Sequence, residues 1–393
     1  MLSNRANILS PSPTIAIDSQ AKALAREGID VINFSAGEPD FDAPATAREG
    51  VIEAVTQGKN KYTPTAGYQE LLQEIARKFR DENGLQYAPE QIVVSNGAKH
   101  SIMNAFLALV DPGDEVLFQS PYWVSYPEMA KLCGGVPVVE TTEATGFKMT
   151  PEMLSQKLTA RSKLLVLNSP SNPTGAVYHP DELRALVEVA VRRGLYIVSD
   201  EIYEHLLYDG AVTASPASFG TEAYDRTVTV NGFSKAYAMT GWRAGYLGAP
   251  PAIAKAINAI QSQMTSGISS LTQMGALRAL QGSQAPREEM RQAFDERRQY
   301  VVKRLAEIPG LRLTGVPRGA FYVFPNVSGT YGRTIGETLI DNSDTLARVL
   351  LAKANVAVVP GSGFGAPDYV RMSYANSMER LKTGLDRIQE LLG

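Results

Sequence analysis

Between residues 91 and 232, short apolar runs alternate with segments of helical spacing. The segments QIVVSN (91–96), KLLVLN (163–168), LYIVSD (195–200) and RTVTVNG (226–232) have the length of strands, and DPGDEVLFQ (111–119) reads as a turn followed by a strand. Residues 99–110 and 181–194 repeat apolar residues every three or four positions. Strands that are apolar along their whole length are buried on both faces, which is typical of parallel sheets joined by helices. The pattern therefore predicts an α/β fold in which helices flank a mostly parallel central sheet.

The last hundred residues have a different pattern. A long charged helical stretch at about 286–308 precedes short strand-like segments at 319–325, 355–361 and 369–374 and helical stretches at 343–354 and 377–392. This mixture predicts a smaller α+β domain. We expect a large domain at 46–285 and a small domain formed by 1–45 and 286–393; a helix near 15–27 could pack against either.

The bulk properties of the chain restrict its partners. The net charge of −3 is spread over 393 residues without a basic run, so a nucleic-acid partner is not expected. No apolar stretch approaches the ~18 residues of a membrane span, and the start of the chain lacks the apolar run of a signal peptide. The single cysteine, Cys133, excludes an intramolecular disulfide and suits a reducing cytoplasm. The three histidines lie far apart, and no metal site is expected.

Polar residues follow directly after several predicted strands. Gly97, Asn168 and Asp200 lie at or just past strand ends, and Asn231 ends a strand four residues before Lys235. Because ligands bind at the carboxyl ends of the strands in open α/β sheets, these residues are candidates for one site. No metal-ligand spacing connects them, so we expect a bound organic cofactor instead.

The segment NGFSKAYAMTGWRAGY (231–246) carries two charged side chains, Lys235 and Arg243. A lysine in a dry, apolar pocket has a lowered pKa, and its neutral amine can form a Schiff base with an aldehyde. A lone lysine is more often a solvated surface residue. The other charge, Arg243, follows eight positions later.

From Gly232 to Gly245, this segment resembles, position by position, the lysine-attachment signature of the class I and II pyridoxal-phosphate aminotransferases. The resemblance extends over nearly the whole chain and is strongest to the bacterial 1β subgroup of aspartate aminotransferases. It implies the PLP fold type I, with pyridoxal 5′-phosphate attached to Lys235 beside Ser234 and its phosphate bound by Arg243.

The resemblance also implies roles for residues around the cofactor ring. Asp200 would pair with the pyridine nitrogen, Tyr203 and Asn172 would contact the phenolic oxygen, and Trp123 would stack on the ring. Without the resemblance, Asp200 could be a helix N-cap, Asn172 a turn residue and Trp123 a core residue. Asn172–Pro173 and Ser120–Pro121 are expected to be cis peptides by the same analogy.

Further residues are implied to bind the phosphate. Gly97, Ala98 and Lys99 lie at a strand-to-helix junction, and backbone N–H groups at a helix N-terminus bind anions. Tyr62 resembles a tyrosine that reaches the phosphate in the neighbouring subunit. The resemblance therefore implies a homodimer with shared active sites.

Two segments resemble substrate contacts. Gly37, in SAGEPDF, matches a glycine whose backbone meets the substrate carboxylate, and Arg371, in YVRMSY, matches the arginine that binds the α-carboxylate. Asn172 and Trp123 would also approach substrate, and Thr14 is a candidate for closing the site. GSGFG (361–365) lacks the spacing of a dinucleotide fingerprint and is predicted to be a loop near Arg371.

The implied reaction is a ping-pong transfer of an amino group from L-aspartate, or a related acidic amino acid, to 2-oxoglutarate. The catalytic residues would be Lys235, Asp200 and Tyr203, with Lys235 moving the proton. The family's distal-carboxylate arginine has no counterpart in 262–270, and Lys99 is the candidate replacement. A prephenate, aromatic or broad-range aminotransferase stays open, as does a lyase on the same scaffold. A fused transcription regulator is disfavoured by the short N-terminal segment, and a binding protein without catalysis by the presence of Lys235.

Overall fold

The computed structural model describes residues 2–393, and at its centre lies a sheet with the strand order β2-β8-β7-β6-β5-β3-β4. The strands are β2 (Ile92–Ser95), β3 (Glu115–Ser120), β4 (Val136–Thr141), β5 (Ser162–Asn168), β6 (Tyr196–Asp200), β7 (Thr227–Gly232) and β8 (Gly245–Gly248). β8 is antiparallel to both of its neighbours, whereas the other pairs are parallel. The predicted mostly parallel sheet is confirmed.

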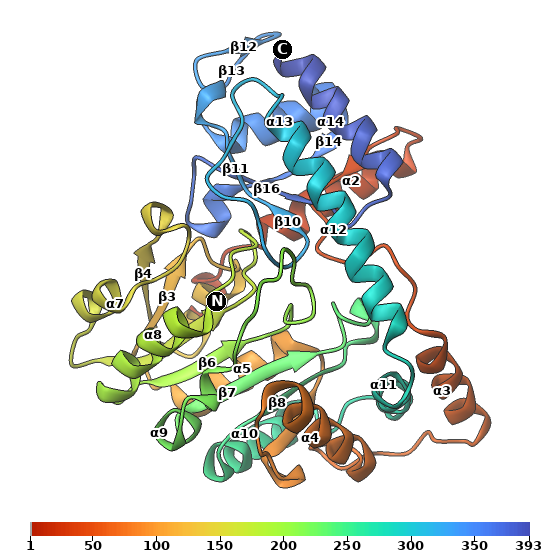
Figure 1. Ribbon diagram of the computed structural model, residues 1–393, viewed down its shortest axis with the longest axis vertical. Coiled ribbons are helices and arrows are strands. Elements are labelled where there is room, and N and C mark those ends of the chain that lie inside the picture. The colour runs from red at the N-terminus through yellow and green to blue at the C-terminus, as the bar shows by residue number, and fades with distance from the viewer. Residues whose placement is uncertain (1) are drawn as a thin grey trace.

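Helices cover both faces of this sheet (Figure 1). In β5, Leu164 and Val166 pack in one core cluster and Leu165 and Leu167 in another. The first cluster involves α5 (Ala98–Leu109), α6 (Ser125–Leu132) and α10 (Pro251–Met264), and the second involves α7 (Pro151–Lys157) and α8 (Pro180–Arg192). Since alternate residues of a strand point to opposite faces, burial on both sides explains the continuous apolar runs.

A third cluster lies at the β2 end of the sheet, against α3 (Ala45–Thr56), α4 (Gln69–Asn83) and α11 (Ser270–Gln281). Two further helices, α1 (Asn4–Asn7) and α9 (Thr221–Tyr224), have a single turn each. Helix ends follow local signals where the chain provides them. Thr150 caps α7 through the N–H of Met153, and Pro151 occupies its first turn.

The sequence pattern did not predict β4 or β8. β8 reads GYLG, and glycine has low strand propensity. Both glycines are required by close packing, because a Cβ on Gly245 would lie 2.1 Å from the Ala98 nitrogen and one on Gly248 would lie 2.5 Å from the Tyr87 ring. β4 is a half-exposed edge strand that contains Pro137, and edge strands tolerate proline.

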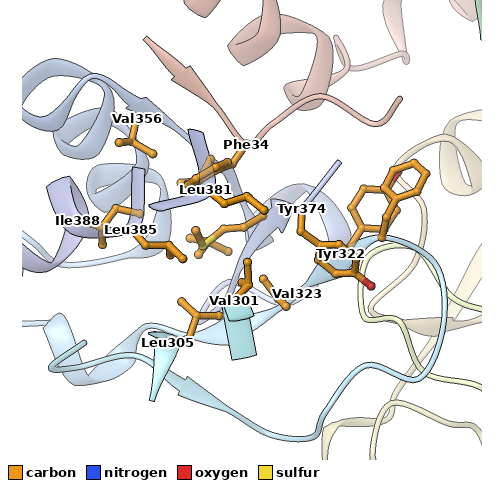
Figure 2. Packing of buried hydrophobic residues seen from close by; sticks show 14 of the residues in the cluster. Phe34, Val301, Leu305, Tyr322, Val323, Val356, Tyr374, Leu381, Leu385 and Ile388 are labelled. Carbon is orange, nitrogen blue, oxygen red and sulfur yellow. The ribbon is translucent and has the colours of Figure 1, made fainter. Parts of the chain in front are cut away.

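The C-terminal elements form a separate cluster of buried side chains. Figure 2 shows side chains of the long helix α12 (Ala285–Leu305), the strand β10 (Tyr322–Val323) and the last helix α14 (Met378–Leu392) converging with Phe34. The other elements here are α13 (Ser343–Ala354), β1 (Ile32–Asn33), β9 (Arg312–Leu313), β11 (Pro325–Asn326), β12 (Thr334–Ile335), β13 (Thr338–Leu339), β14 (Val356–Ala357), β15 (Val359–Pro360) and β16 (Val370–Ser373). The N-terminal helix α2 (Pro13–Arg26) packs against β1, β14 and β15.

Two expected strands are each divided in the structure. The segment 319–325 gives β10, which pairs with β16, and then β11, which pairs with β9. The segment 355–361 gives β14 and β15, which pair with different strands. Pro325 and Pro360 lack the N–H that a continuous ladder needs. The domain boundaries at residues 46 and 285 stay a prediction.

Candidate active site

A cavity of about 350 Å³ lies at the carboxyl ends of the central strands, and residues of the C-terminal cluster also line it. The sequence-predicted site residues in its lining are Thr14, Gly37, Ala98, Lys99, Trp123, Asn172, Asp200, Tyr203, Ser234, Lys235, Arg243 and Arg371. Strand ends therefore bring together residues that lie far apart in the sequence, as expected for this kind of sheet. Gly97 lies just behind the lining, and Tyr62 does not reach it.

Lys235 lies in the loop that follows β7, next to the buried Ser234. Its Nζ donates a hydrogen bond to the carbonyl oxygen of Gly37 and lies 5.8 Å from the ring centroid of Tyr203. Burial and the neighbouring Arg371 lower the pKa of Lys235 to about 8. A useful fraction of the amine is therefore neutral near physiological pH, which is the form that acts as a nucleophile or base.

Asp200 is the last residue of β6 and is buried. Its Oδ2 accepts a hydrogen bond of 2.7 Å from the hydroxyl of Tyr126. Burial raises the pKa of the Asp200 carboxyl to about 6, although the Tyr126 hydroxyl and the N–H of Ile202 oppose this shift. The following residues form turns instead of a helix, so Asp200 is not a helix N-cap.

Arg371, in β16, is buried and held by uncharged groups. Its Nη1 donates to Asn172 Oδ1 (3.0 Å), and its Nη2 donates to the Ser35 carbonyl oxygen (2.7 Å). The guanidinium lies 4.5 Å from the ring centroid of Tyr322, and Nε has no hydrogen-bond partner within residues 2–393. A buried cation with a free donor is costly unless an anion binds there, which points to a carboxylate ligand.

The turn between β2 and α5 and the first residues of α5 form a further part of the cavity wall. Gly97 has a φ of 84°, and a Cβ there would lie 2.4 Å from Nη2 of Arg243. Arg243 donates to the carbonyl oxygens of Thr240 (2.9 Å) and Asn96 (3.3 Å). The guanidinium and the first N–H groups of α5 therefore lie side by side, which is the donor set of an anion site.

The aromatic and flanking residues occupy the walls. Trp123 lies edge-on to Tyr126, with ring centroids 5.4 Å apart, and the Nζ of Lys99 lies 5.2 Å from the Trp123 ring centroid. Burial and Arg243 lower the pKa of Lys99. Thr14, at the start of α2, shares a hydrogen bond of 2.8 Å with Ser12. Phe364 of the GSGFG segment lies 5.2 Å from the Arg371 guanidinium, so the segment lies near Arg371 as predicted, but Gly361–Phe364 form a short 3-10 helix instead of an irregular loop.

Sequence reasoning missed two side chains of the site, Tyr322 and Tyr126, and gave no role to a third, Asn168. Tyr322 shares a hydroxyl hydrogen bond of 2.8 Å with Tyr203. Asn168 accepts the Asn172 N–H (2.8 Å) and donates to the Asp200 carbonyl oxygen (3.0 Å), and Tyr126 holds Asp200. Asn168 was visible as a strand-end residue without an assigned role. Tyr126 follows Trp123 at helical spacing, which alone indicates only a shared face.

The two predicted cis peptides, Ser120–Pro121 and Asn172–Pro173, are present, and Ser169–Pro170 is also cis. Tyr62 is fully exposed in the single chain. A role for Tyr62 would therefore require another subunit.

Comparison with known proteins agrees with this geometry. Residues 29–388 match the family described as aminotransferase class I and II. The chain is 48% identical to a probable aspartate/prephenate aminotransferase of Aquifex aeolicus, over 100% of this chain and 98% of that protein. It is 47% identical to the aspartate aminotransferase of Geobacillus stearothermophilus, with the same coverage.

Among solved structures, the aspartate aminotransferase of Thermus thermophilus with maleate superposes with a TM-score of 0.94 at 44% identity, covering 100% of both chains. The match of the family model over most of the chain, the full-length relatives and the shared architecture lead to one assignment. The chain belongs to the class I and II aminotransferases.

Proposed function

We propose that this aminotransferase moves the amino group of L-aspartate, or a related acidic amino acid, to 2-oxoglutarate with pyridoxal 5′-phosphate as its cofactor. The observation that carries the proposal is that two basic side chains with different properties line the same cavity. Lys235 has an amine with a lowered pKa, and Arg371 has a buried guanidinium whose Nε is without a partner. An amino acid would place its carboxylate against Arg371 while the amine of Lys235 acts at its α-carbon.

The residues present fit this cofactor. Gly97 and Ala98 leave room for Arg243 beside the start of α5, which suits a phosphate. The Asp200 carboxylate is positioned by Tyr126 and would bind the ring nitrogen, and Tyr203 and Asn172 would bind the phenolic oxygen. Trp123 would cover the ring. When bound, pyridoxal phosphate supplies an aldehyde carbon and a ring that accepts electrons from the substrate's α-carbon.

The chain's own residues then divide the work. Arg371 and Asn172 would bind and orient the α-carboxylate, with the backbone of Gly37 beside it, and the Arg371 guanidinium is fixed between Tyr322 and Phe364. Nζ of Lys235 would take the proton from the substrate's α-carbon as general base and, as general acid, would deliver it to the carbon that the cofactor's aldehyde supplies. The buried Asp200 carboxylate would hold positive charge at the ring nitrogen.

The preference for an acidic donor rests on Lys99 and on the relatives. Lys99 lines the cavity and lies over Trp123. One relative is named aspartate aminotransferase and another aspartate/prephenate aminotransferase, and the Thermus structure carries maleate, a dicarboxylate. Prephenate is the second candidate substrate, because the Aquifex relative is named a probable aspartate/prephenate aminotransferase.

We further propose that the enzyme is a cytoplasmic homodimer. Tyr62 is fully exposed, and Ile52, Val55 and Met264 also expose more than half of their surface. A second copy would cover such side chains and bring its Tyr62 to the phosphate. The single cysteine, whose thiol pKa burial raises to about 11, suits a reducing compartment. Within residues 2–393, no helix combines the length and apolar character needed to cross a membrane.

We expect Tyr126→Phe to lower kcat by about tenfold, because a hydrogen bond to a charged group contributes about 1.5–3 kcal/mol. Without the hydroxyl, the pKa of Asp200 rises further, and the acid limb of the pH–kcat profile moves to higher pH. Steady-state kinetics across pH measures both effects. Tyr178→Phe is the control, since that hydroxyl is also buried but bonds to Gln119 and the Met149 N–H away from the cavity. Equal kcat in both variants would show that the Tyr126 hydroxyl does not contribute to catalysis through Asp200.

We expect Lys99→Ala to slow the reaction of aspartate by about 10- to 100-fold while an aromatic donor reacts at the wild-type rate, because only aspartate presents a second carboxylate. Rapid mixing with each donor, followed by the absorbance of the bound cofactor, measures the two rates. Lys163→Ala is the matched control, because the Lys163 Nζ also lies over an aromatic ring, 5.7 Å from the Tyr196 ring centroid. Lys163 is at the amino end of β5, whereas the cavity lies at the carboxyl ends of the strands. Equal slowing of both donors would instead assign Lys99 to the cofactor alone.

The test of the proposed function is a product assay with purified, cofactor-loaded protein. Beyond one equivalent per active site, oxaloacetate should form from aspartate only when 2-oxoglutarate is present, with one glutamate made for each further oxaloacetate. A keto acid or ammonia that accumulates without an acceptor would identify a lyase instead.

A further inference from the structure

A buried group of polar and charged side chains lies behind the turn that carries Asp200 and Tyr203. Those two residues line the cavity. Glu201, between them, is buried, and the side chain of Glu204, next to Tyr203, lies against α4 and β7 and is only 8% exposed. We call this group the rear network, and it consists of Lys78, Asn83, Ser199, Glu201, Glu204, Ser215 and Asn231. None of these described residues belongs to the lining of the cavity.

Glu204 connects the turn to the end of β7. It accepts hydrogen bonds from Lys78 Nζ, from Asn83 Nδ2 (2.6 Å) and from Asn231 Nδ2 (2.6 Å). Asn231 Oδ1 in turn accepts the N–H of Gly232 (2.8 Å), just before the loop of Lys235. The side chains of Lys78 and Glu204 are 4% and 8% exposed, so this ion pair is shielded from water. The carboxylate of Glu204 therefore connects the turn that carries Tyr203 to the end of β7, the strand that leads to Lys235.

Glu201 connects the same turn to β6 and to the segment after it. Its Oε1 accepts hydrogen bonds from the hydroxyls of Ser199 (2.8 Å) and Ser215 (2.7 Å), and its backbone N–H donates to the Val230 carbonyl oxygen (2.9 Å). Burial and the nearby Glu204 raise the pKa of Glu201 to about 8. Since one ammonium faces two carboxyl groups, a protonated Glu201 leaves the buried charges balanced.

The surrounding charges do not make a metal site. Glu82, Glu204 and His205 offer ligand atoms within 4.8 Å of one another. However, Lys78 pairs with Glu204, and Arg287 lies 3.4 Å from Glu82 and 3.0 Å from the His205 ring, so cations already neutralise these carboxylates. The titratable groups that act on Glu201 are Lys78, Glu204 and Tyr87. Those around Glu204 are Lys78, His205, Glu82, Arg287, Tyr237 and Tyr246.

We propose that Glu201 and Glu204 are positioning residues, which through the rear network hold Asp200, Tyr203 and the chain leading to Lys235 in the arrangement that transamination requires. The inference rests on the proposed function. The arrangement is complete with Glu204 ionised and Glu201 protonated. Ionisation of Glu201 adds a second buried negative charge, which loosens the turn and slows the reaction.

The first test compares two double variants that both remove the buried ion pair. Lys78→Met/Glu204→Leu deletes the acceptor of Asn231, whereas Lys78→Met/Glu204→Gln keeps an acceptor oxygen there. Removing both partners of a buried pair is tolerated better than removing one, so both proteins are expected to fold. We expect kcat per bound cofactor to fall about 10- to 100-fold in the Leu variant, with the KM for the donor unchanged, and most of it to return in the Gln variant.

The second test replaces Glu201 by glutamine, which keeps the volume and cannot ionise. Ionisation of Glu201 should lower wild-type kcat in a one-proton step as pH rises through about 8, and this step should be absent from Glu201→Gln. Deprotonation of Lys235 over the same pH range raises kcat in both proteins, so the difference between their profiles isolates the step. Glu115→Gln is the matched control. Glu115 is also buried and accepts two hydroxyl hydrogen bonds, from Thr159 (2.7 Å) and Ser162 (2.9 Å), but it lies at the amino end of β3. Its substitution should leave the step unchanged.

Wild-type kcat in the folded Leu variant, together with an alkaline step that persists in Glu201→Gln, would overturn the inference. If the Leu variant does not fold, the pH profile of Glu201→Gln decides alone. Failure of the wild-type protein to transfer an amino group at all would instead refute the proposed function, so the two failures are distinguishable.

Discussion

Lys235→Ala is expected to lower kcat/KM for transamination by at least about 10⁴-fold, because both the covalent hold on the cofactor and the general base are lost. Within residues 2–393, the lining of the cavity holds two other lysines, Lys22 and Lys99, and the amine of Lys22 is engaged in a salt bridge of 2.7 Å. The guanidinium of Arg371 is always charged, and the amine of Lys99 lies over Trp123. The variant should also lose the visible absorbance that reports the cofactor's bond to the lysine.

The same measurement needs a control for folding and for the loss of a positive charge. Lys255→Ala provides it, since Lys255 is exposed on α10, outside the lining of the cavity. Its kcat/KM should equal that of the wild type. Substantial activity in Lys235→Ala, with its melting temperature preserved, would show that another residue carries the chemistry.

Arg371→Leu is expected to lower kcat/KM for amino acid donors by about 10²- to 10⁴-fold, which corresponds to the loss of a buried, hydrogen-bonded charge pair. The guanidinium is fixed by Asn172 and by the Ser35 carbonyl oxygen, so it would meet a carboxylate without reorganisation. Most of the loss should appear as a higher KM. Arg371→Lys should not restore activity, because an ammonium cannot make the planar, two-point contact.

A donor without a carboxylate separates binding from folding in this experiment. A primary amine of similar size should react slowly with the wild type, and Arg371→Leu should not slow it further. An equal loss for the amine and for aspartate would mean that Arg371 supports the structure of the cavity instead of binding the substrate.

Local patterns were sufficient to predict much of the architecture. The strands β5, β6 and β7 are buried on both faces, so their composition alone identifies them. Strand-end residues such as Asp200 were placed correctly because parallel strands end at one edge of the sheet. β8 could not be predicted, since its two glycines are set by contacts with Ala98 and Tyr87 and not by strand propensity.

Within the site, local motifs could likewise be predicted from the sequence, whereas hydrogen bonds between distant elements could not. The Lys235 segment is recognisable because one short stretch contains the whole pattern. Tyr322 and Tyr203 are 119 residues apart, and only the packing of β10 near the central sheet brings their hydroxyls together. Likewise, Tyr126 and Asp200 lie on separate elements, and the spacing within either element carries no information about the hydrogen bond between them.

The most direct test of the proposed aspartate aminotransferase is a set of single half-reactions with a panel of amino acids. Purified, cofactor-loaded protein is mixed with one donor at a time, without an acceptor, and the absorbance of the bound cofactor is followed. The account predicts rapid, stoichiometric conversion to the amino form of the cofactor by aspartate and glutamate. Conversion by aromatic donors while aspartate stays inert would contradict it and would make the prephenate or aromatic assignment the correct one.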